Sequence, residues 1–246
     1  MFCRRLSMAV AIVLISGSTA FAAGKDDSSD DILQAQPCSI PASVVNNVLG
    51  QLASVVNLKN GGLFSPNLMW AAVVDRQGTL CGVARSDPDA WPGSRDIAIA
   101  KATTANGFSN SQLALLTANL YGPTQPGGSL YGLNNSNPFN SFFNAQGTGN
   151  GFAVGGIITF GGGVALYQGG KVVGGLGVSG DTSCADHAIA YRMRAQASLN
   201  GTPSSDNISY YAGDSAADGL VTSPDQVDPS QFKQPHCLGA SKDVTP

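Results

Sequence analysis

The chain has 246 residues, of which 12% are charged and 31 are glycine, and its formal net charge is −3. This balance, with no basic stripe, argues against nucleic acid and acidic membrane surfaces as partners. About 210 residues remain after the N-terminal segments described below, which is enough for one domain with a sizeable core.

The first 22 residues have the three parts of a secretory signal peptide. A pair of arginines supplies positive charge, residues 8–15 are apolar, and Ala20 and Ala22 are small residues at the positions that signal peptidase reads. The apolar run is too short to span a bilayer core, which needs about 20 apolar residues. We therefore expect cleavage before Ala23, no membrane span afterwards, and a periplasmic or secreted protein.

The mature chain divides into three parts. Residues 23–37 are acidic and serine-rich, which predicts a disordered lead-in. Residues 38–199 contain all the strongly patterned segments and form the predicted domain. Residues 200–246 are a polar tail, which we expect a disulfide to tie back to the domain.

Four cysteines remain after cleavage, Cys38, Cys81, Cys184 and Cys237. An even number in an exported protein predicts two disulfides. The chain has no C-x-x-C pair and only two histidines, so the spacing typical of zinc ligands is missing. Of the three possible connectivities we predict Cys38–Cys81 and Cys184–Cys237, because these pairs tie the first helix to the first hairpin and the tail to the last helix.

The first half of the domain predicts helices around one hairpin. Residues 41–56 carry apolar side chains at spacings of three and four, which indicates a helix. Residues 68–74 and 79–85 are strand-like and flank a turn that ends in glycine, which indicates a β-hairpin. A short helix is expected over 94–105. Another is expected from Ser109, because a glutamine follows three residues later as in a capping box.

The second half begins with an irregular segment, residues 121–151, rich in Gly, Asn, Pro and Ser. A strand is expected over 152–160. Two further strands are expected on either side of Gly169-Gly170, a two-residue hairpin turn. The last helix is expected over 182–199, with a short strand at 208–211. This order predicts an α+β fold with an antiparallel sheet and helices packed on it.

Two motifs are typical of a dinucleotide-binding loop and of a hydrolase triad, but we prefer a structural interpretation of both. Residues 175–180 match G-x-G-x-x-G, but they end a hairpin and no ribose-binding acid on a second parallel strand follows. We interpret these glycines as allowing a tight turn and close helix packing. Ser179, Asp186 and His187 are residue types of a hydrolase triad, yet the G-x-S-x-G elbow is missing and adjacent side chains diverge on a helix.

Two groups of side chains remain as candidate sites. On the last helix, His187, Tyr191 and Arg194 lie nearly opposite an apolar face. They therefore face solvent, a subunit contact or a ligand. Near the helix over 94–105, Trp91, Arg95 and Lys101 offer an anion site or, as we favour, a packed tryptophan beside a surface salt bridge.

Several of these segments resemble the GlcG/HbpS-like family, the haem-binding or haem-degrading domain. Its first hairpin resembles residues 72–78, its central helix resembles 94–105, and its closing hairpin resembles residues 162–166 and 173–180. The resemblance covers roughly residues 44–197. The chain differs in carrying Asp186-His187 where family members often carry Asp-Glu, in its long irregular segment, and in its four cysteines.

The resemblance implies a sheet of about five antiparallel strands flanked by helices, as in profilin and PAS domains, and a homo-oligomer. It also implies an exported protein that binds a small molecule, with haem or another tetrapyrrole as the ligand. His187 would be the axial iron ligand, and Arg194 would pair with a propionate, with Tyr191 between them. A haem-degrading enzyme and a structural module without ligand are the alternatives, and no catalytic residue is assigned.

Overall fold

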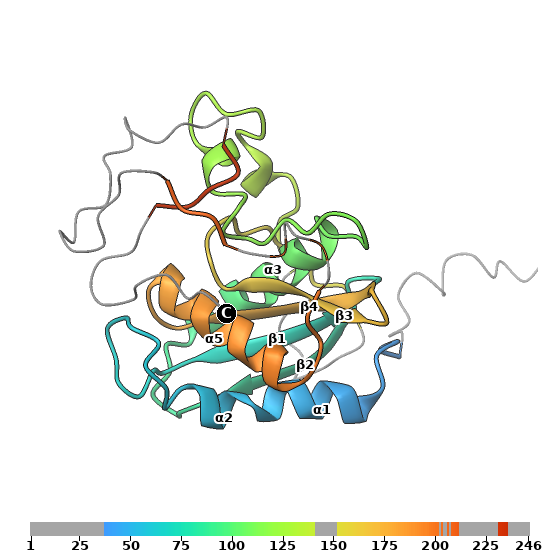
Figure 1. Cartoon of the computed structure of the whole chain (residues 1–246), viewed down its shortest axis with the longest axis vertical. Coiled ribbons are helices and arrows are strands. Elements are labelled where there is room, and N and C mark those ends of the chain that lie inside the picture. Colours follow the sequence, from blue (N-terminus) through green and yellow to red (C-terminus); the bar gives the residue numbers. More distant parts are fainter. Residues whose placement is uncertain are drawn as a thin grey trace, which may run out of the picture. The chain divides into compact units, whose positions relative to one another are not determined.

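Four strands form one antiparallel sheet at the centre of the molecule (Figure 1). A computed structural model describes residues 37–140, 152–201, 203, 206, 208–211 and 231–235. The predicted signal peptide and nearly all of the predicted lead-in lie outside these residues. Among the described helices, none combines the length and the apolar character needed to cross a membrane.

The sheet has the order β2-β1-β4-β3, so its two hairpins lie side by side. The strands are β1 (Trp70–Asp75), β2 (Leu80–Arg85), β3 (Gly163–Gln168) and β4 (Lys171–Ser179). Both predicted hairpins are confirmed. The first turn places Gly78 at φ 84°, and the Asp75 carboxylate accepts hydrogen bonds from the backbone N–H groups of Gln77 and Thr79.

The α+β class is confirmed, but the sheet has four strands where about five were expected. In the region predicted as the strand over 152–160, only Ala153 makes a bridge, with Thr79. Gly155 and Gly156 adopt positive φ angles of 78° and 91°, which interrupts an extended backbone. Near the tail, Tyr210 likewise forms an isolated bridge in place of a strand.

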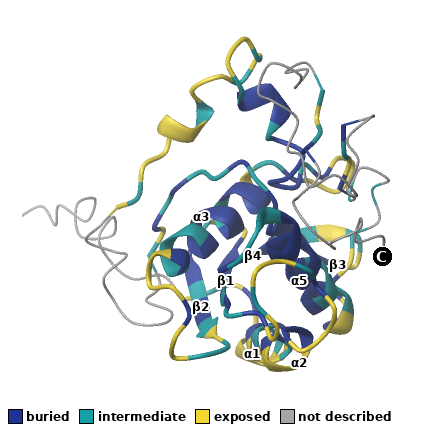
Figure 2. Ribbon diagram, turned by 90° about the vertical axis from the view of Figure 1, so that its left-hand side faces the viewer, coloured by how far each residue is buried: buried dark blue, intermediate teal, exposed yellow. Residues whose placement is uncertain are grey.

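Helices cover both faces of the sheet (Figure 1). On one face, α1 (Ala42–Gly50), α2 (Leu52–Val55) and α5 (Ser183–Gln196) share an apolar cluster with the sheet. On the other face, α3 (Gly93–Gly107) packs on a second cluster. Successive residues of β1 alternate between the two clusters, as a buried strand requires. Figure 2 shows much of α3 and α5 buried, while α1 and α2 expose their outer sides.

The G-x-G-x-x-G glycines lie where α3 comes closest to the sheet. A Cβ atom on Gly175 would overlap the carbonyl oxygen of Ala102, and one on Gly177 would overlap that of Ala98. These contacts match our interpretation that the glycines permit close packing of a helix. They leave no room for a side chain at either position.

The helix expected from Ser109 does not form. Asn110 accepts hydrogen bonds on its side-chain oxygen from the backbone N–H groups of Gln112 and Leu113, each at 2.8 Å. The same turn has the backbone N–H of Asn110 donating to the carbonyl oxygen of Leu113, and Ser109 bridges to Ala114 in antiparallel fashion, so the chain folds back where a helix would continue. The region continues through two short 3₁₀ turns, η1 (Gly122–Thr124) and η2 (Leu133–Asn135).

The predicted Cys38–Cys81 disulfide is present, with the two Cα atoms 5.3 Å apart. It joins the residues just before α1 to β2, as expected. Cys184, in the first turn of α5, is also disulfide-bonded. Its predicted partner, Cys237, lies outside the described residues.

Candidate functional site

The three residues predicted to share a helix face do lie together on α5. The helix begins after Thr182, whose hydroxyl accepts a hydrogen bond from the backbone N–H of Ala185. The ring centroids of His187 and Tyr191 are 6.5 Å apart. The guanidinium carbon of Arg194 lies 4.9 Å from the Tyr191 ring centroid. The spacing of four and three therefore produces one continuous group of side chains.

This face does not point to solvent, which corrects one of the three expected environments. His187 is 1% exposed and Arg194 is fully buried. A Cβ atom built on Gly161 would lie 3.2 Å from the Cβ of His187 and 3.1 Å from Oε1 of Gln234. Segments distant in sequence thus cover a helix face that the helical pattern alone presents as free.

His187 is a buried imidazole with unused hydrogen-bonding capacity. Within the described part of the chain, neither Nδ1 nor Nε2 has a hydrogen-bond partner. Burial, together with the positive charges of Arg194 and Lys101, lowers the pKa of His187 from its ordinary 6.5 to about 3. The ring is therefore neutral at physiological pH and keeps a lone pair available to a metal ion.

Arg194 is only partly engaged. Its Nη1 donates to the carbonyl oxygen of Ala165 at 2.9 Å and to Oδ1 of Asp206 at 2.8 Å. Its Nε and Nη2 have no hydrogen-bond partner among the described residues. Nη1 thus links Arg194 to neighbouring segments of the chain, while Nε and Nη2 remain as donors suited to a carboxylate.

These side chains fit a tetrapyrrole in two respects. A neutral imidazole is the usual proximal ligand of haem iron. A guanidinium with free donors pairs with carboxylates such as propionates. Both groups stand on one face of one helix, at positions i and i+7, so one ligand of sufficient length can meet both.

Beside this face lies an ion pair that the sequence analysis missed. Lys101 was assigned to a surface salt bridge, but its side chain is fully buried and its Nζ lies 2.6 Å from Oδ2 of Asp186. The ammonium also donates to the carbonyl oxygen of Val178 at 3.1 Å and lies 4.7 Å from the Phe160 ring centroid. The available signal was the run of alanines around Lys101 on α3, which marks a packed face.

Burial dominates the electrostatics of this pair. Desolvation raises the pKa of Asp186 to about 6, and the attraction of Lys101 opposes the rise. Desolvation also lowers the pKa of Lys101, against the attraction of Asp186. The second carboxylate oxygen, Oδ1, accepts from the backbone N–H of Asp181 at 2.9 Å. The pair is satisfied internally and leaves little capacity for a ligand.

The group of Trp91, Arg95 and Lys101 does not assemble. Arg95 pairs with the adjacent Asp96 at 3.4 Å, whereas Lys101 is buried against the sheet. Trp91 is half exposed and meets Phe64 edge to face, with centroids 5.5 Å apart. The tryptophan, which precedes α3, therefore packs against a different surface region, the loop between α2 and β1.

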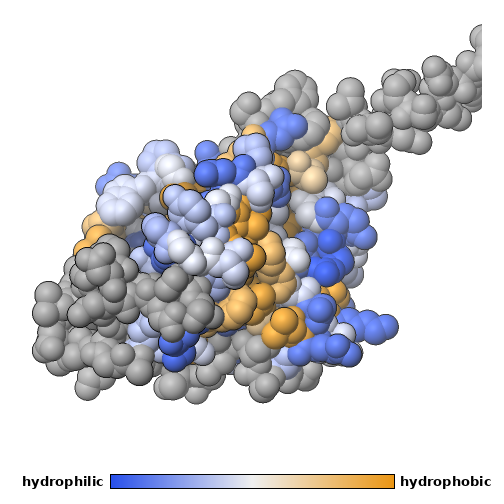
Figure 3. Space-filling view, turned by 90° about the horizontal axis from the view of Figure 1, so that it is seen from above, coloured by the Kyte–Doolittle hydropathy of each residue, from blue (hydrophilic) through white to orange (hydrophobic). Residues whose placement is uncertain are grey.

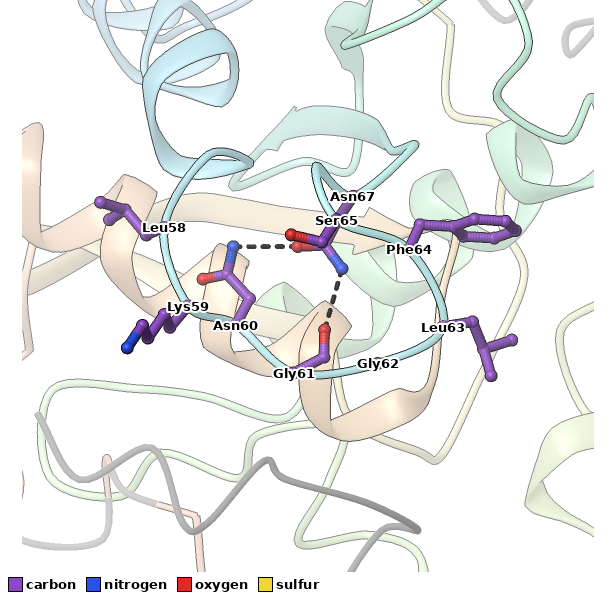
Figure 4. A pocket seen from close by; sticks show the side chains of 9 residues that line it. All are labelled: Leu58, Lys59, Asn60, Gly61, Gly62, Leu63, Phe64, Ser65 and Asn67. Atoms are coloured by element: carbon purple, nitrogen blue, oxygen red, sulfur yellow. Dashed lines mark hydrogen bonds between the residues drawn. The ribbon is translucent and has the colours of Figure 1, made fainter.

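That loop encloses a pocket of about 320 Å³ lined by residues 58–65 and Asn67 (Figure 4). Asn67 bridges the loop by accepting from Asn60 at 3.1 Å and donating to the carbonyl oxygen of Gly61 at 3.0 Å. The Asp181 carboxylate accepts from the backbone N–H groups of Leu63 and Phe64.

Comparison with known proteins identifies the family. The family model described as haem-degrading protein HbpS-like matches residues 66–195. The chain belongs to this HbpS-like family. The match includes Lys101 and Asp186 as well as the candidate face of α5.

Curated relatives agree with this assignment. The chain is 36% identical over 124 residues to the corrinoid adenosyltransferase PduO of Citrobacter freundii, covering 48% of this chain and 30% of that enzyme. It is 35% identical over 119 residues to an uncharacterised 15.0 kDa protein from the dhaT-dhaS intergenic region of the same organism, covering 48% of this chain and 68% of that protein. The chain thus spans less than a third of the adenosyltransferase.

Two solved structures are similar to the HbpS-like chain. The Klebsiella pneumoniae protein ORFY is 25% identical with a TM-score of 0.49, over 68% of this chain and 95% of that one. A PduOC–haem complex is 27% identical with a TM-score of 0.46, over 64% of this chain and 94% of that one.

Proposed function

We propose that this protein binds a tetrapyrrole, haem first among them, through the α5 face of His187, Tyr191 and Arg194. The observation that carries the proposal is a buried, neutral imidazole without a hydrogen-bond partner among the described residues. Buried polar atoms are normally satisfied, and exceptions in a native structure call for a partner such as a ligand. The haem-degrading description of the family supports the choice of ligand.

Each residue has a distinct task in this proposal. His187 would hold the iron through one ring nitrogen, and the low pKa of its imidazole means that no proton competes for that nitrogen at neutral pH. Arg194 would hold a carboxylate through Nε and Nη2, while Nη1 stays bonded to Ala165 and Asp206. Tyr191 would offer its ring to the macrocycle. Bound haem supplies a redox-active iron.

The test is a titration of the mature protein with haemin, read from the Soret band. We expect saturable binding that the substitution His187→Ala weakens at least tenfold. The chain has only two histidines, so His236→Ala is the matched control and should bind as the wild type does. Equal binding by His187→Ala and wild type would overturn the assignment of His187. A titration of Phe64→Ala would then test the loop pocket, and no binding by any variant would favour a structural module.

The family description favours a second candidate, a haem-degrading enzyme. Degradation needs a position on the iron that oxygen can reach. After binding is saturated, addition of a reductant in air distinguishes the two. A persistent Soret band indicates a binding protein, and a progressive loss that needs both reductant and oxygen indicates an enzyme.

Export to the periplasm or beyond is part of the proposal. The disulfide between Cys38 and Cys81 supports it, since such bonds persist in oxidising compartments. N-terminal sequencing of the protein from its native compartment should begin at Ala23. A chain that still begins at Met1 would contradict export by this signal.

We also propose self-association. Figure 3 shows a hydrophobic band between hydrophilic patches on one face. Apolar areas of this kind often mark interfaces. Light scattering should give at least twice the monomer mass, and a monomer at micromolar concentration would contradict the proposal.

A further inference from the structure

Beside the Cys38–Cys81 disulfide lies a carboxylate, that of Asp75. The two sulfur atoms and one oxygen of this carboxylate all lie within 4.8 Å of one another. Cys38 precedes α1, Asp75 ends β1 and Cys81 lies in β2, and the two cysteines are 43 positions apart. Both cysteines are partly exposed, whereas Asp75 is buried. The fold therefore gathers, near the surface, three metal-ligating atoms that no local spacing in the sequence brings together.

Backbone donors hold the Asp75 carboxylate in place. Its Oδ1 accepts from the N–H groups of Gln77 and Thr79, each at 3.0 Å. Its Oδ2 accepts from the N–H of Ser39 at 2.9 Å. Because Ser39 directly follows Cys38, this bond keeps Cys38 beside the carboxylate independently of the disulfide. Carboxylates that bind metal ions are typically oriented by hydrogen bonds of this kind.

One further donor to Oδ2 is replaceable. The Ser39 hydroxyl lies 3.1 Å from Oδ2 of Asp75 and 3.2 Å from Oε1 of Gln77. A hydroxyl has a single proton, so it donates fully to only one acceptor at a time. When the hydroxyl donates to Gln77, a lone pair of Oδ2 becomes free for a cation. The three backbone N–H groups still hold the carboxylate in that arrangement.

We propose that Cys38, Cys81 and Asp75 bind a thiophilic divalent cation such as Zn²⁺ when the disulfide is reduced. Two thiol molecules supply two electrons and two protons, so that the S–S bond breaks, both cysteines become thiols, and the reductant becomes a disulfide. The cation then displaces both thiol protons. Two thiolates, one carboxylate oxygen and one water make a tetrahedral set of the kind that zinc accepts.

The backbone spacing suits both states of the site. The Cα atoms of Cys38 and Cys81 are 5.3 Å apart, within the usual range for a disulfide. Two sulfur atoms bound to one tetrahedral zinc ion at about 2.3 Å lie about 3.8 Å from each other. Rotation about the Cα–Cβ bonds provides this separation while the backbone stays in place. Reoxidation to the disulfide removes two of the three protein ligands and releases the ion. The site is separate from the tetrapyrrole site proposed on α5.

A titration with Co²⁺ tests the proposal, because Co²⁺ enters the same kinds of site as Zn²⁺ and its charge-transfer absorption reports thiolate ligands. The mature protein is reduced with a phosphine and kept free of oxygen. We expect one Co²⁺ per chain with a charge-transfer band that added Zn²⁺ removes, and no band in the oxidised protein. The double variant Cys184→Ala, Cys237→Ala is the matched control. It removes the other two cysteines of the mature chain and should bind as the wild type does.

Three single variants assign the ligands, with circular dichroism as the check on folding. Cys81→Ser should abolish the band. Asp75→Asn should keep the band and weaken Co²⁺ binding about tenfold or more. Ser39→Ala removes the hydroxyl that competes for Oδ2 but keeps the backbone N–H, so it should bind Co²⁺ more tightly than the wild type does.

Three results would each overturn the site: no band in the reduced wild type, an equal band in Cys81→Ser, or loss of the band in the double variant that lacks Cys184 and Cys237. Wild-type affinity in both Asp75→Asn and Ser39→Ala would overturn the carboxylate as a ligand. None of these measurements involves haemin, so the outcome is independent of the proposed function.

Discussion

Two adjacent residues of α5 enter two very different environments. Asp186 meets Lys101 at 2.6 Å, and both oxygens of its carboxylate have donors. His187, one residue later and equally buried, has no hydrogen-bond partner among the described residues. Burial alone therefore does not separate a structural polar group from a functional one. The two kinds of group differ in whether their hydrogen-bonding atoms have partners, because an unsatisfied buried group costs free energy that a ligand can recover.

The comparison assigns opposite roles to the pair of Lys101 and Asp186 and to the pair of His187 and Arg194. The Lys101–Asp186 pair links α3 to α5, which pack on opposite faces of the sheet, and is complete without a ligand. His187 and Arg194 keep buried hydrogen-bonding atoms that have no partner among the described residues. Removing a member of the first pair should damage the fold, whereas removing His187 should damage binding and spare the fold.

The substitution Lys101→Met is therefore expected to cause the largest loss of unfolding free energy. This change leaves the Asp186 carboxylate buried without its cation, which typically costs about 3–5 kcal/mol of unfolding free energy. Urea denaturation at pH 7.5 measures the loss. The double variant Lys101→Met, Asp186→Leu should recover most of it, since an apolar pair carries no buried charge. A loss below about 1 kcal/mol in the single variant would show that the pair is not the structural link described.

Acid should destabilise the protein through His187. Because its folded-state pKa of about 3 lies below its ordinary value of 6.5, the unfolded chain takes up the proton first as the pH falls. The stability contributed by the neutral ring is complete above pH 6.5 and is lost between pH 6.5 and 3, at up to about 1.4 kcal/mol per pH unit.

Asp186 opposes this slope. Its folded-state pKa of about 6 lies above the ordinary 3.8, so its contribution is present below pH 3.8 and is lost as the pH rises to 6. The measurement is therefore the difference between wild type and His187→Leu, in which the Asp186 contribution cancels. Unfolding free energies at pH 7, 6, 5 and 4 should show this difference shifting against the wild type in acid. Parallel curves would contradict the burial of a neutral imidazole.

The parts of the fold predicted from the sequence are those that local rules decide. Both hairpins, α3 and α5 follow from hydrophobic periodicity and from glycines at turns. The helix expected from Ser109 fails because the backbone reverses there, with Asn110 donating to Leu113 and Leu115 donating to Phe108. The strand expected over 152–160 fails at Gly155 and Gly156. In both cases a local turn of a few residues prevailed over the sequence pattern that predicted a helix or a strand.

The candidate site divides in the same way. That His187, Tyr191 and Arg194 share a face follows from the helical repeat, and the structure confirms it. That the face is buried depends on contacts with distant segments, such as the approach of Gly161 to the Cβ of His187, which no helical pattern reports. The partner of Lys101 is 85 positions away, so the ion pair was equally hidden. Contacts between distant segments are decided by the packing of the whole sheet.

The smallest expected change in unfolding free energy, that of His187→Leu, best distinguishes the environment of His187 from that of Asp186. At pH 7.5, His187→Leu replaces two unsatisfied nitrogens by an apolar side chain of similar size, and replacing such groups is nearly neutral or stabilising. We expect a gain of about 0.5–1 kcal/mol in unfolding free energy together with the loss of haemin binding. Residues kept for function at a cost in stability behave in this way.

Met193→Leu is the matched control for that measurement. Met193 is fully buried on the packed side of the same helix, and a volume-conserving change there should cost less than about 1.5 kcal/mol. Haemin binding should be unchanged, because the residue faces the core. A loss of more than about 1 kcal/mol in His187→Leu would mean that the imidazole has a stabilising partner within the chain, and the contrast with Asp186 would then disappear.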